Sequence, residues 1–302
     1  MDQFLAVRAF TAVVETGSFV KAANALELPR NTVTKLVQAL EAHLRVKLLN
    51  RTTRRVSTTN DGTAYYERMA RLIDEWQEAD LALGSAQSNP RGKLRVDMGA
   101  TIATVLVIPA LPEFQRRYPD LQIDIGVSDR PVDLLGDRVD CVVRSGVITD
   151  PSLIARQIGD MPFVTTATPG YLRKHGVPKH PSDLENDHLL IRYFFAGTGR
   201  KLPIELVRGN ERINVNGRHF VGINDTNAML AAGLAGLGVM HSPAFIAEQH
   251  IASGLLVPLL RDWKADSVPL SIVYAPNRHL STRVRVFVDW MVELIRERGL
   301  GR

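Results

Sequence analysis

Cysteine is nearly absent from this chain, with Cys141 alone among 302 residues. A single cysteine excludes an intrachain disulfide and any metal site built from several thiolates. Cys141 stands in the apolar stretch Val139 to Val143, which predicts a buried strand, and a free cysteine is most often a small core residue. A redox-sensing thiol, which would have to be exposed, is the alternative.

Long hydrophobic runs are also missing, since no stretch approaches the roughly 20 apolar residues of a membrane span. The first residues, Met1-Asp2-Gln3, lack the basic-then-apolar pattern of a signal peptide, so we expect a cytoplasmic protein without a membrane partner and not a solute receptor of transport. The chain has no glycine-rich phosphate loop, nucleophile elbow or metal-ligand pair at helical spacing. We therefore expect no catalytic residues, no cofactor and no bound metal.

Excess charge is absent from most of the chain and concentrated at one end. Residues 1–60 contain nine Lys/Arg and four Asp/Glu, whereas residues 61–302 contain twenty-eight of each sign. A short basic segment attached to a neutral body is typical of a protein that meets a polyanion through that segment. A chain of this length is expected to form about two or three domains.

The first sixty residues carry the pattern of a helix-turn-helix. Asp2 and Ser18 are helix-capping residues, and Gly17 ends the first helix. A short second helix is predicted from Phe19 to about Leu26, and a third from about Arg30 to Leu44 after a turn at Leu28-Pro29. A supporting helix followed by two helices and a tight turn favours DNA binding in a major groove.

Donor-rich side chains mark the start of the third helix, where a recognition helix enters the groove. The segment from Leu48 to Ser57 predicts a two-stranded wing whose basic residues meet phosphates. The predicted DNA-binding residues are Arg30, Asn31, Thr32, Thr34, Lys35 and Gln38 on the helix and Arg51, Thr53, Arg54 and Arg55 on the wing.

Three segments resemble the LysR-type transcriptional regulators: GSFVKAANAL at 17–26, VTKLVQALE at 33–41 and LLNRTTRR at 48–55. Two positions depart from the family pattern. Pro29 and Arg30 replace its small polar cap and glutamine, and we expect Pro29 in the first turn of the helix, with Arg30 altering base preference. Arg45 replaces its glycine, and a left-handed turn would strain arginine mildly, so the turn is expected to differ.

A long helix is predicted from Gly62 to about Gln87. Apolar residues recur at alternating spacings of four and three, which forms a heptad seam and favours pairing with a second copy of the helix. Packing against the chain's own body is the alternative, and the resemblance favours the antiparallel dimer. The predicted dimerisation residues are Tyr65, Met69, Leu72, Trp76 and Leu83, with Ala79 on the same seam.

Strand and helix patterns alternate from Lys93 onward, which indicates an α/β body with a largely parallel sheet. Helices are expected at Val105–Tyr118 and Val132–Asp137, and the chain is expected to cross between two units near Gly159–Phe163 and Asp266–Pro269. The resemblance implies the architecture of periplasmic solute receptors. The predicted domains are a winged helix-turn-helix at 1–60, a linker helix at 61–89 and an effector-binding domain at 90–302, with subdomain I at about 93–160 and 268–302 and subdomain II at about 163–265.

The cleft between the two units is the predicted effector site, because ligands of open α/β sheets bind beyond the carboxyl ends of strands. Helix starts and hydroxyls there suit a small anion such as a carboxylate, while plain helix capping is the alternative for Thr101, Thr226 and Ser242. Asp129 and Arg144 have opposite effects on an anion and leave the ligand's charge open. The predicted effector-binding residues are Ala100, Thr101, Ile102, Ser128, Arg144, Asp225, Thr226 and His241, of which the resemblance implies Thr101, Ser128 and the segments around Thr226 and His241.

The predicted function is therefore that of a LysR-type regulator that binds promoter DNA under the control of a small-molecule effector. Its expected partners are double-stranded promoter DNA, the effector, further copies of itself and RNA polymerase. The resemblance implies a homotetramer of two dimers, with a dimer or an octamer as alternatives.

Overall fold

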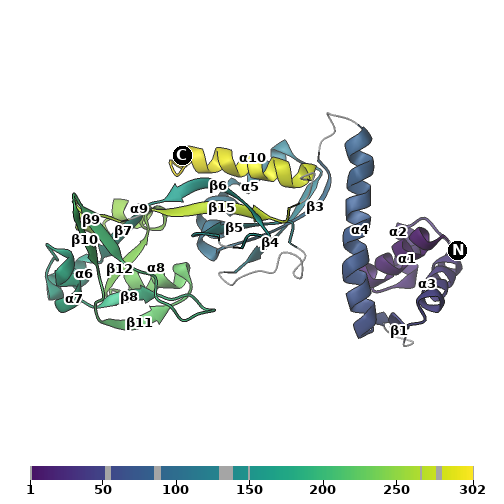
Figure 1. The fold of residues 1–302 in the computed structure, drawn as a ribbon, viewed down its shortest axis with the longest axis horizontal. Coiled ribbons are helices and arrows are strands. Elements are labelled where there is room, and N and C mark those ends of the chain that lie inside the picture. Colours follow the sequence, from purple (N-terminus) through teal and green to yellow (C-terminus); the bar gives the residue numbers. More distant parts are fainter. Residues whose placement is uncertain are drawn as a thin grey trace. The chain divides into compact units, whose positions relative to one another are not determined.

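The computed structural model describes residues 2–51, 56–84, 90–128, 139–148, 150–265, 267–276 and 281–301. The chain divides into two compact units, which we call the head, Met1–Ser88, and the body, Asn89–Arg302 (Figure 1). Within the described ranges, no helix combines the length and the apolar character that a membrane crossing requires.

Three short helices form the head as the sequence predicts: α1 (Gln3–Thr16), α2 (Phe19–Ala25) and α3 (Arg30–Leu44). The Asp2 carboxylate caps α1 by accepting from the Leu5 amide at 3.0 Å, and Ser18 caps α2. Gly17, between them, has φ +64°, which glycine adopts without a Cβ penalty. The helical spacing of α3 predicts that Val33, Val37, Leu40 and Leu44 face inward; the first three are fully buried in the head core and Leu44 is partly buried against it.

Both ends of α3 differ from expectation. Pro29 lies at the N-cap with extended backbone, one residue before the first turn where it was predicted, and Arg30 is the first helical residue. Arg45 adopts the left-handed conformation with φ +55°, so the turn is left-handed although the sequence predicted that arginine would make it differ. The main chain accounts for this, because the Arg45 and Val46 amides donate to the carbonyls of Ala42 and Glu41.

The wing is a two-stranded antiparallel sheet of β1 (Leu49–Arg51) and β2 (Val56–Thr58), as predicted. The wing tip, which includes Thr53, Arg54 and Arg55, lies outside the described residues. The long helix α4 (Asn60–Gly84) follows, beginning two residues before the predicted start.

One face of α4 packs against the core formed by the other elements of the head. Tyr65, Met69 and Ile73 are partly buried against the head core, and the Trp76 ring meets Phe4 edge-on at 4.3 Å between centroids. Leu72 remains 54% exposed. The amino-terminal half of the predicted seam therefore has partners within the same chain, while Leu72 presents an apolar surface to solvent.

Subdomain I of the body is a five-stranded sheet in the order β4-β3-β5-β15-β6. Its core includes Phe114, Phe287 and Trp290, from the helices that cover the sheet. A π-helical turn opens the first of these helices, a feature found frequently at functional sites. The elements are β3 (Gly92–Met98), η1 (Ile102–Val107), α5 (Ile108–Arg117), β4 (Leu121–Val127), β5 (Cys141–Ser145), β6 (Ile154–Met161), β15 (Val268–Tyr274) and α10 (Thr282–Glu297).

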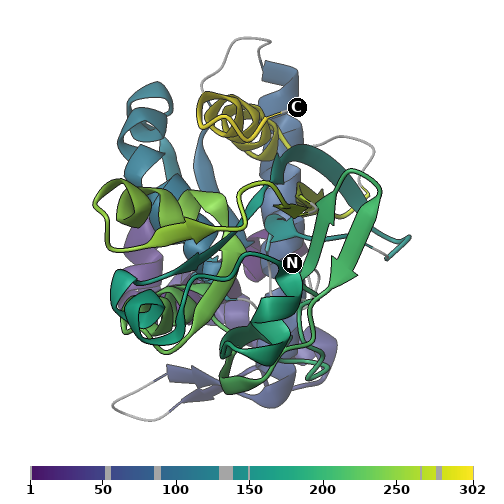
Figure 2. The ribbon, with the colours of Figure 1, turned by 90° about the vertical axis from the view of Figure 1, so that its left-hand side faces the viewer.

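Subdomain II has a second five-stranded sheet in the order β11-β8-β12-β7-β13 and a small sheet in the order β10-β9-β14, which faces the viewer in Figure 2. The sequence did not predict the small sheet or the strands β6, β8 and β13. The elements are β7 (Phe163–Ala167), α6 (Pro169–His175), α7 (Pro181–Asn186), β8 (Leu190–Tyr193), β9 (Glu205–Arg208), β10 (Glu211–Asn214), β11 (His219–Ile223), α8 (Thr226–Leu234), β12 (Val239–Pro243), α9 (Ala244–Ala252), β13 (Val257–Leu259) and β14 (Lys264–Ala265).

The chain crosses between the subdomains at the two predicted places, at Pro162 between β6 and β7 and again between β14 and β15. The large sheets are mixed, however, and not largely parallel. Strand β15 runs antiparallel to β5 and β6, and β7 runs antiparallel to β12 and β13. A strand that enters a sheet directly from the other subdomain needs no crossover helix, so it can run against its neighbours. The short helix predicted at Val132–Asp137 lies outside the described residues.

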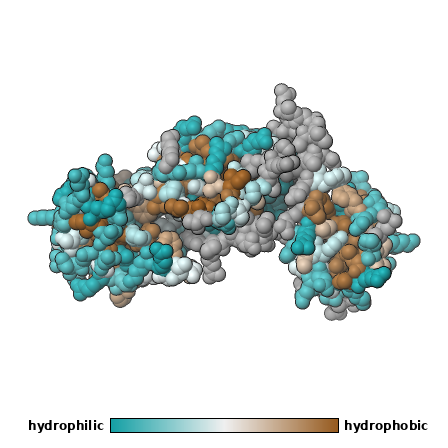
Figure 3. Space-filling model, viewed as in Figure 1, coloured by the Kyte–Doolittle hydropathy of each residue, from teal (hydrophilic) through white to brown (hydrophobic). Residues whose placement is uncertain are grey.

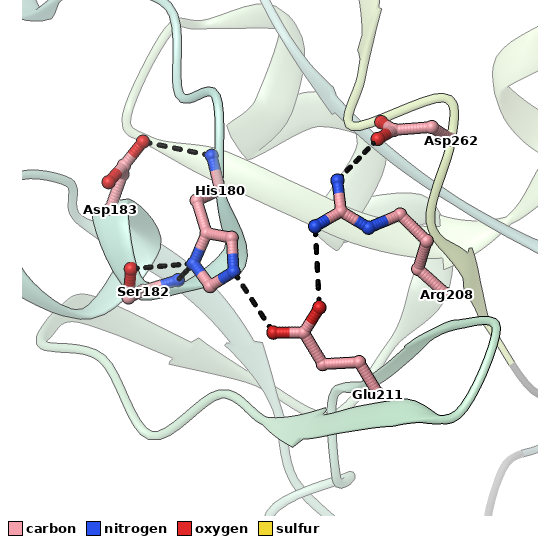
Figure 4. A network of polar contacts seen from close by, with 6 residues as sticks. All are labelled: His180, Ser182, Asp183, Arg208, Glu211 and Asp262. Atoms are coloured by element: carbon pink, nitrogen blue, oxygen red, sulfur yellow. Dashed lines mark hydrogen bonds and ion pairs between the residues drawn. The ribbon is translucent and has the colours of Figure 1, made fainter.

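A network of polar contacts ties α7 to the small sheet (Figure 4). The His180 ring bonds to Ser182 Oγ at 2.8 Å and lies 3.4 Å from the Glu211 carboxylate. Arg208 bridges Glu211 and Asp262, and its guanidinium also lies 4.4 Å from the centroid of the Trp263 ring. These charges are exposed, and this end of the body presents a mostly hydrophilic surface (Figure 3). The network therefore holds α7 and the small sheet together at the surface of subdomain II.

Candidate DNA-binding surface and effector cleft

The start of α3 presents the predicted base-reading side chains. Arg30, Asn31, Lys35 and Gln38 are exposed, while Thr32 and Thr34 are half-buried. The Thr34 hydroxyl donates to the Arg30 carbonyl at 3.1 Å, a bond within the helix. Thr34 is therefore the least available of the predicted donors, and the free face is dominated by long side chains.

The wing brings Arg51 to the end of β1, beside Val56 of β2. Among the described residues of 1–60, three further Lys/Arg side chains are exposed: Lys21 on α2, Arg45 at the end of α3 and Lys47 before β1. None of the three is among the predicted DNA-binding residues, because they fall at a helix end, in a turn or on the helix before the recognition helix. The positive excess of residues 1–60, which was the available signal, includes all three.

Thr101 and Asn227 join the two sides of the predicted cleft. The Thr101 hydroxyl makes no capping bond and instead donates to Asn227 Oδ1 at 3.3 Å. Asp225 caps α8 by accepting from the Ala228 amide at 2.7 Å, so Thr226 is not the cap. Ser242 lies within β12 and caps no helix. Plain capping is therefore wrong for all three residues considered.

Arg144 carries an internal counter-ion that the sequence analysis missed. Its guanidinium lies 2.5 Å from the Asp97 carboxylate on the adjacent strand β3, and both side chains are largely buried. Gly126 on β4 makes room for this carboxylate, because a Cβ there would lie 2.5 Å from Asp97 Oδ2. The positive charge assigned to the effector site is therefore balanced from within subdomain I. Ser128 follows β4, and Asp129 lies outside the described residues.

His241 is buried in subdomain II, with only 6% of its surface exposed. Its Nδ1 lies 3.0 Å from Thr165 Oγ1, and its ring stacks on Phe163. Burial, with the nearby charge of Arg192, lowers the pKa of His241 from 6.5 to about 4, so the ring is neutral near pH 7. Strands β8 and β12 are parallel, with Ile191 opposite Met240. The next residues along the two strands, Arg192 and His241, therefore lie side by side on one face of the sheet. Burial also lowers the pKa of Arg192, whose Nη1 donates to the Val215 carbonyl at 3.2 Å.

A hollow of about 220 Å³ adjoins His241. Phe163 and Val268, the first residues after the two crossings, form part of its wall. Its remaining lining is Leu202, Pro203 and Glu205, and the Glu205 carboxylate pairs with Arg212. A mostly apolar lining with a few polar groups is typical of a small-molecule pocket.

Cys141 is fully buried in β5, as the sequence predicts, and burial raises the pKa of its thiol. A protonated, inaccessible thiol is a poor redox sensor. Cys141 therefore acts as a core residue.

A winged helix-turn-helix head joined by a long helix to a two-subdomain α/β body defines a class of DNA-binding regulators with a sensing domain on the same chain. The family model described as the bacterial regulatory helix-turn-helix protein, LysR family, matches residues 4–63, and that of the LysR substrate binding domain matches residues 87–296. The chain belongs to the LysR family of transcriptional regulators.

Relatives with known names agree in both sequence and fold. An HTH-type transcriptional repressor of Pseudomonas aeruginosa is 39% identical over 98% of this chain and 93% of the relative. CrgA, a LysR-type regulator from Neisseria meningitidis, matches with a TM-score of 0.61 and 31% identity over 96% of this chain and 97% of CrgA. The Vibrio cholerae virulence activator AphB matches with a TM-score of 0.59 and 27% identity over 95% of this chain and 98% of AphB.

Proposed function

We propose that this regulator binds a partly palindromic promoter site as a homo-oligomer and that a small molecule in the inter-subdomain cleft changes that binding. One observation carries the DNA half of the proposal: long donor side chains are exposed on the first turns of α3, in the same head as a two-stranded wing. In this proposal the α3 set from Arg30 to Gln38 reads bases or nearby phosphates, and Arg51, Thr53, Arg54 and Arg55 hold the DNA backbone.

Oligomerisation in this proposal runs through α4. Leu72 and Trp76 are each about half exposed on that helix, which supports pairing with a second copy. Two heads held by a pair of α4 helices would match a two-fold DNA site. A tetramer of two such dimers would hold two sites at once, and the DNA-bound assembly would then contact RNA polymerase.

The effector we propose is a small molecule with a carboxylate. Helix starts converge on the cleft from both subdomains, where η1 and α8 approach through Thr101 and Asn227. Free amides at helix starts favour an anion, and the Asp97–Arg144 pair would supply a cation if the ligand displaced Asp97. A ligand that bridges the subdomains would favour a closed cleft and so change the spacing of the heads and the bend of the DNA.

Both directions of regulation occur among the relatives, since one is named a repressor and another an activator. The relatives are named as regulators, which supports a role in binding and not in catalysis. We propose that the protein acts in the cytoplasm, where promoter DNA is accessible to it.

Footprinting on the DNA upstream of the protein's own gene tests the proposal, with and without a panel of small carboxylic acids and aromatic compounds. We expect a protected two-fold site that shortens or shifts with one acid. A shift caused by an uncharged compound alone would reject the carboxylate. No protection at any salt concentration would reject this site as its target.

A further inference from the structure

Leu48, which precedes the wing strand β1, is held from two sides by different helices. Its side chain and that of Leu49 are buried in the head core, only 2% and 3% exposed. Glu41 of the recognition helix α3 bonds to its amide, and Thr59, the residue before the long helix α4, bonds to its carbonyl. The base of the wing is therefore fixed at one residue that contacts both neighbouring functional elements.

Glu41 supplies the α3 contact. Its Oε1 accepts from the Leu48 amide at 2.9 Å and from the Leu49 amide at 3.0 Å. These bonds are partly buried and charge-assisted, which makes them stronger than bonds between neutral groups. The left-handed turn at Arg45 reverses the chain so that Glu41 reaches the residues that enter β1.

Thr59 and Gly62 supply the α4 contact. The Thr59 amide donates to the Leu48 carbonyl at 2.9 Å, and its hydroxyl donates to the Lys47 carbonyl at 2.7 Å and accepts from the Gly62 amide. A Cβ on Gly62 would lie less than 2.5 Å from the Leu48 oxygen, so the first turn of α4 rests directly on the wing backbone. A side chain at this position would have to move α4 or the wing.

We propose that Glu41, Leu48 and Gly62 form a junction that holds the wing at a set position against both helices, with Glu41 as a positioning residue for the wing's phosphate contacts. The inference rests on the proposed role of Arg54 and Arg55 in those contacts. Because α4 also joins the heads in the proposed dimer, the junction links helix position to wing position. A change at α4 would then alter how the wing meets the DNA.

The test compares the salt dependence of DNA affinity and the hydroxyl-radical footprint of variants in the full chain. The double variant Arg54→Ala/Arg55→Ala is the reference and should reduce the slope of log affinity against log salt by about 2, since each phosphate contributes about 0.9. Glu41→Ala should reduce the slope by a similar amount and lose wing-side protection, while protection opposite α3 remains. Glu41→Gln keeps an acceptor oxygen, so its slope should fall between those of the wild type and Glu41→Ala.

Glu15→Ala is the matched control, because Glu15 is an exposed acid of the head whose carboxylate accepts from Tyr66. It raises the head's charge by the same amount and should leave the slope unchanged. Gly62→Ala disturbs the junction from its α4 side, because the added Cβ meets the Leu48 carbonyl. The footprint of this variant should lack the same wing-side protection as that of Glu41→Ala.

The outcomes separate the two proposals. An unchanged slope in the arginine double variant would overturn the wing contacts themselves, and the junction's role with them. A reduced slope there, with wild-type slopes and footprints for Glu41→Ala and Gly62→Ala, would overturn the junction alone. If Glu41→Ala fails to fold, Glu41→Gln and Gly62→Ala decide the question by the same readouts.

Discussion

Thr101 donates its hydroxyl hydrogen to Oδ1 of Asn227 at 3.3 Å, which links the start of η1 in one subdomain to the start of α8 in the other. The two residues are 126 positions apart and belong to different subdomains. The contact therefore fastens the two walls of the proposed effector site to each other.

Thr101→Val should remove the hydrogen bond to Asn227 while keeping nearly the same side-chain volume, and so weaken the link between the two subdomains. We expect a loss of about 1 kcal/mol in unfolding free energy, the usual net contribution of one hydrogen bond, and a several-fold rise in the effector concentration that shifts the footprint. Chemical unfolding and an effector titration measure the two effects. Thr104→Val is the control, because its hydroxyl bonds within its own helix at 3.0 Å and lies at the edge of range, 3.5 Å, from Asn227. Equal effects of Thr101→Val and Thr104→Val would contradict the assignment of the link between the subdomains to the Thr101–Asn227 hydrogen bond.

Asp97→Asn should weaken the largely buried ion pair between residue 97 and Arg144. Because the pair is largely but not fully buried, we expect a loss of about 2–3 kcal/mol in unfolding free energy, less than for a completely buried pair. Adding Arg144→Met should recover part of this loss, since the double variant leaves no uncompensated charge. Urea unfolding of the two single variants and the double variant measures the coupling, and strictly additive losses would show that the two charges do not interact.

His241 predicts a pH dependence of stability. The folded pKa of about 4 lies below the ordinary 6.5, so the unfolded chain binds the proton more readily. Stability should be constant above about pH 6.5 and fall by about 3 kcal/mol as the pH drops toward 4. Burial also lowers the pKa of His188, so its protonation should likewise destabilise the folded protein as the pH falls. His241→Asn should remove most of the slope, and an unchanged slope would place the titration elsewhere.

Arg30→Gln should change base preference at one position of each half-site. Arg30 is the first residue of α3 and is exposed, and arginine favours guanine edges. We expect discrimination there to change by about 1–3 kcal/mol, measured by competition among single-base variants of the site. Lys47→Gln, an exposed position outside the helix, is the control and should weaken binding to all sequences alike. An identical base profile for wild type and Arg30→Gln would remove Arg30 from the base contacts.

Leu72→Glu tests the proposed pairing through α4. A charge at this half-exposed seam position should dissociate the assembly, reduce the mass seen in sedimentation and remove one half of the two-fold footprint. Ala64→Glu places the same charge on an exposed position of α4 off the seam and should leave the mass unchanged. A wild-type mass for Leu72→Glu would exclude Leu72 from the interface.

Local chemistry determined the helices of the head. Asp2, Gly17 and Ser18 act within four residues of their own positions, so capping and turn signals in the sequence suffice to place α1 and α2. The same holds for the body strands that were predicted, such as β3, β4 and β7, and for both crossings, because hydrophobic period and turn residues mark them in the sequence. The exposed donors on α3 were also predictable, since helical spacing separates them from the buried Val33 and Val37.

Tertiary structure alone decided which of these residues meet. The Asp97 carboxylate neutralises Arg144 because β3 and β5 are neighbours and Gly126 leaves space, and no local pattern encodes that pairing. The antiparallel return of β15 depends on a strand arriving from the other subdomain. Glu41 holds the base of the wing because a left-handed turn at Arg45 folds the chain back onto α3. The sequence by itself determined the elements and their chemistry, whereas contacts between distant segments required the packed fold, because each depends on the placement of both partners.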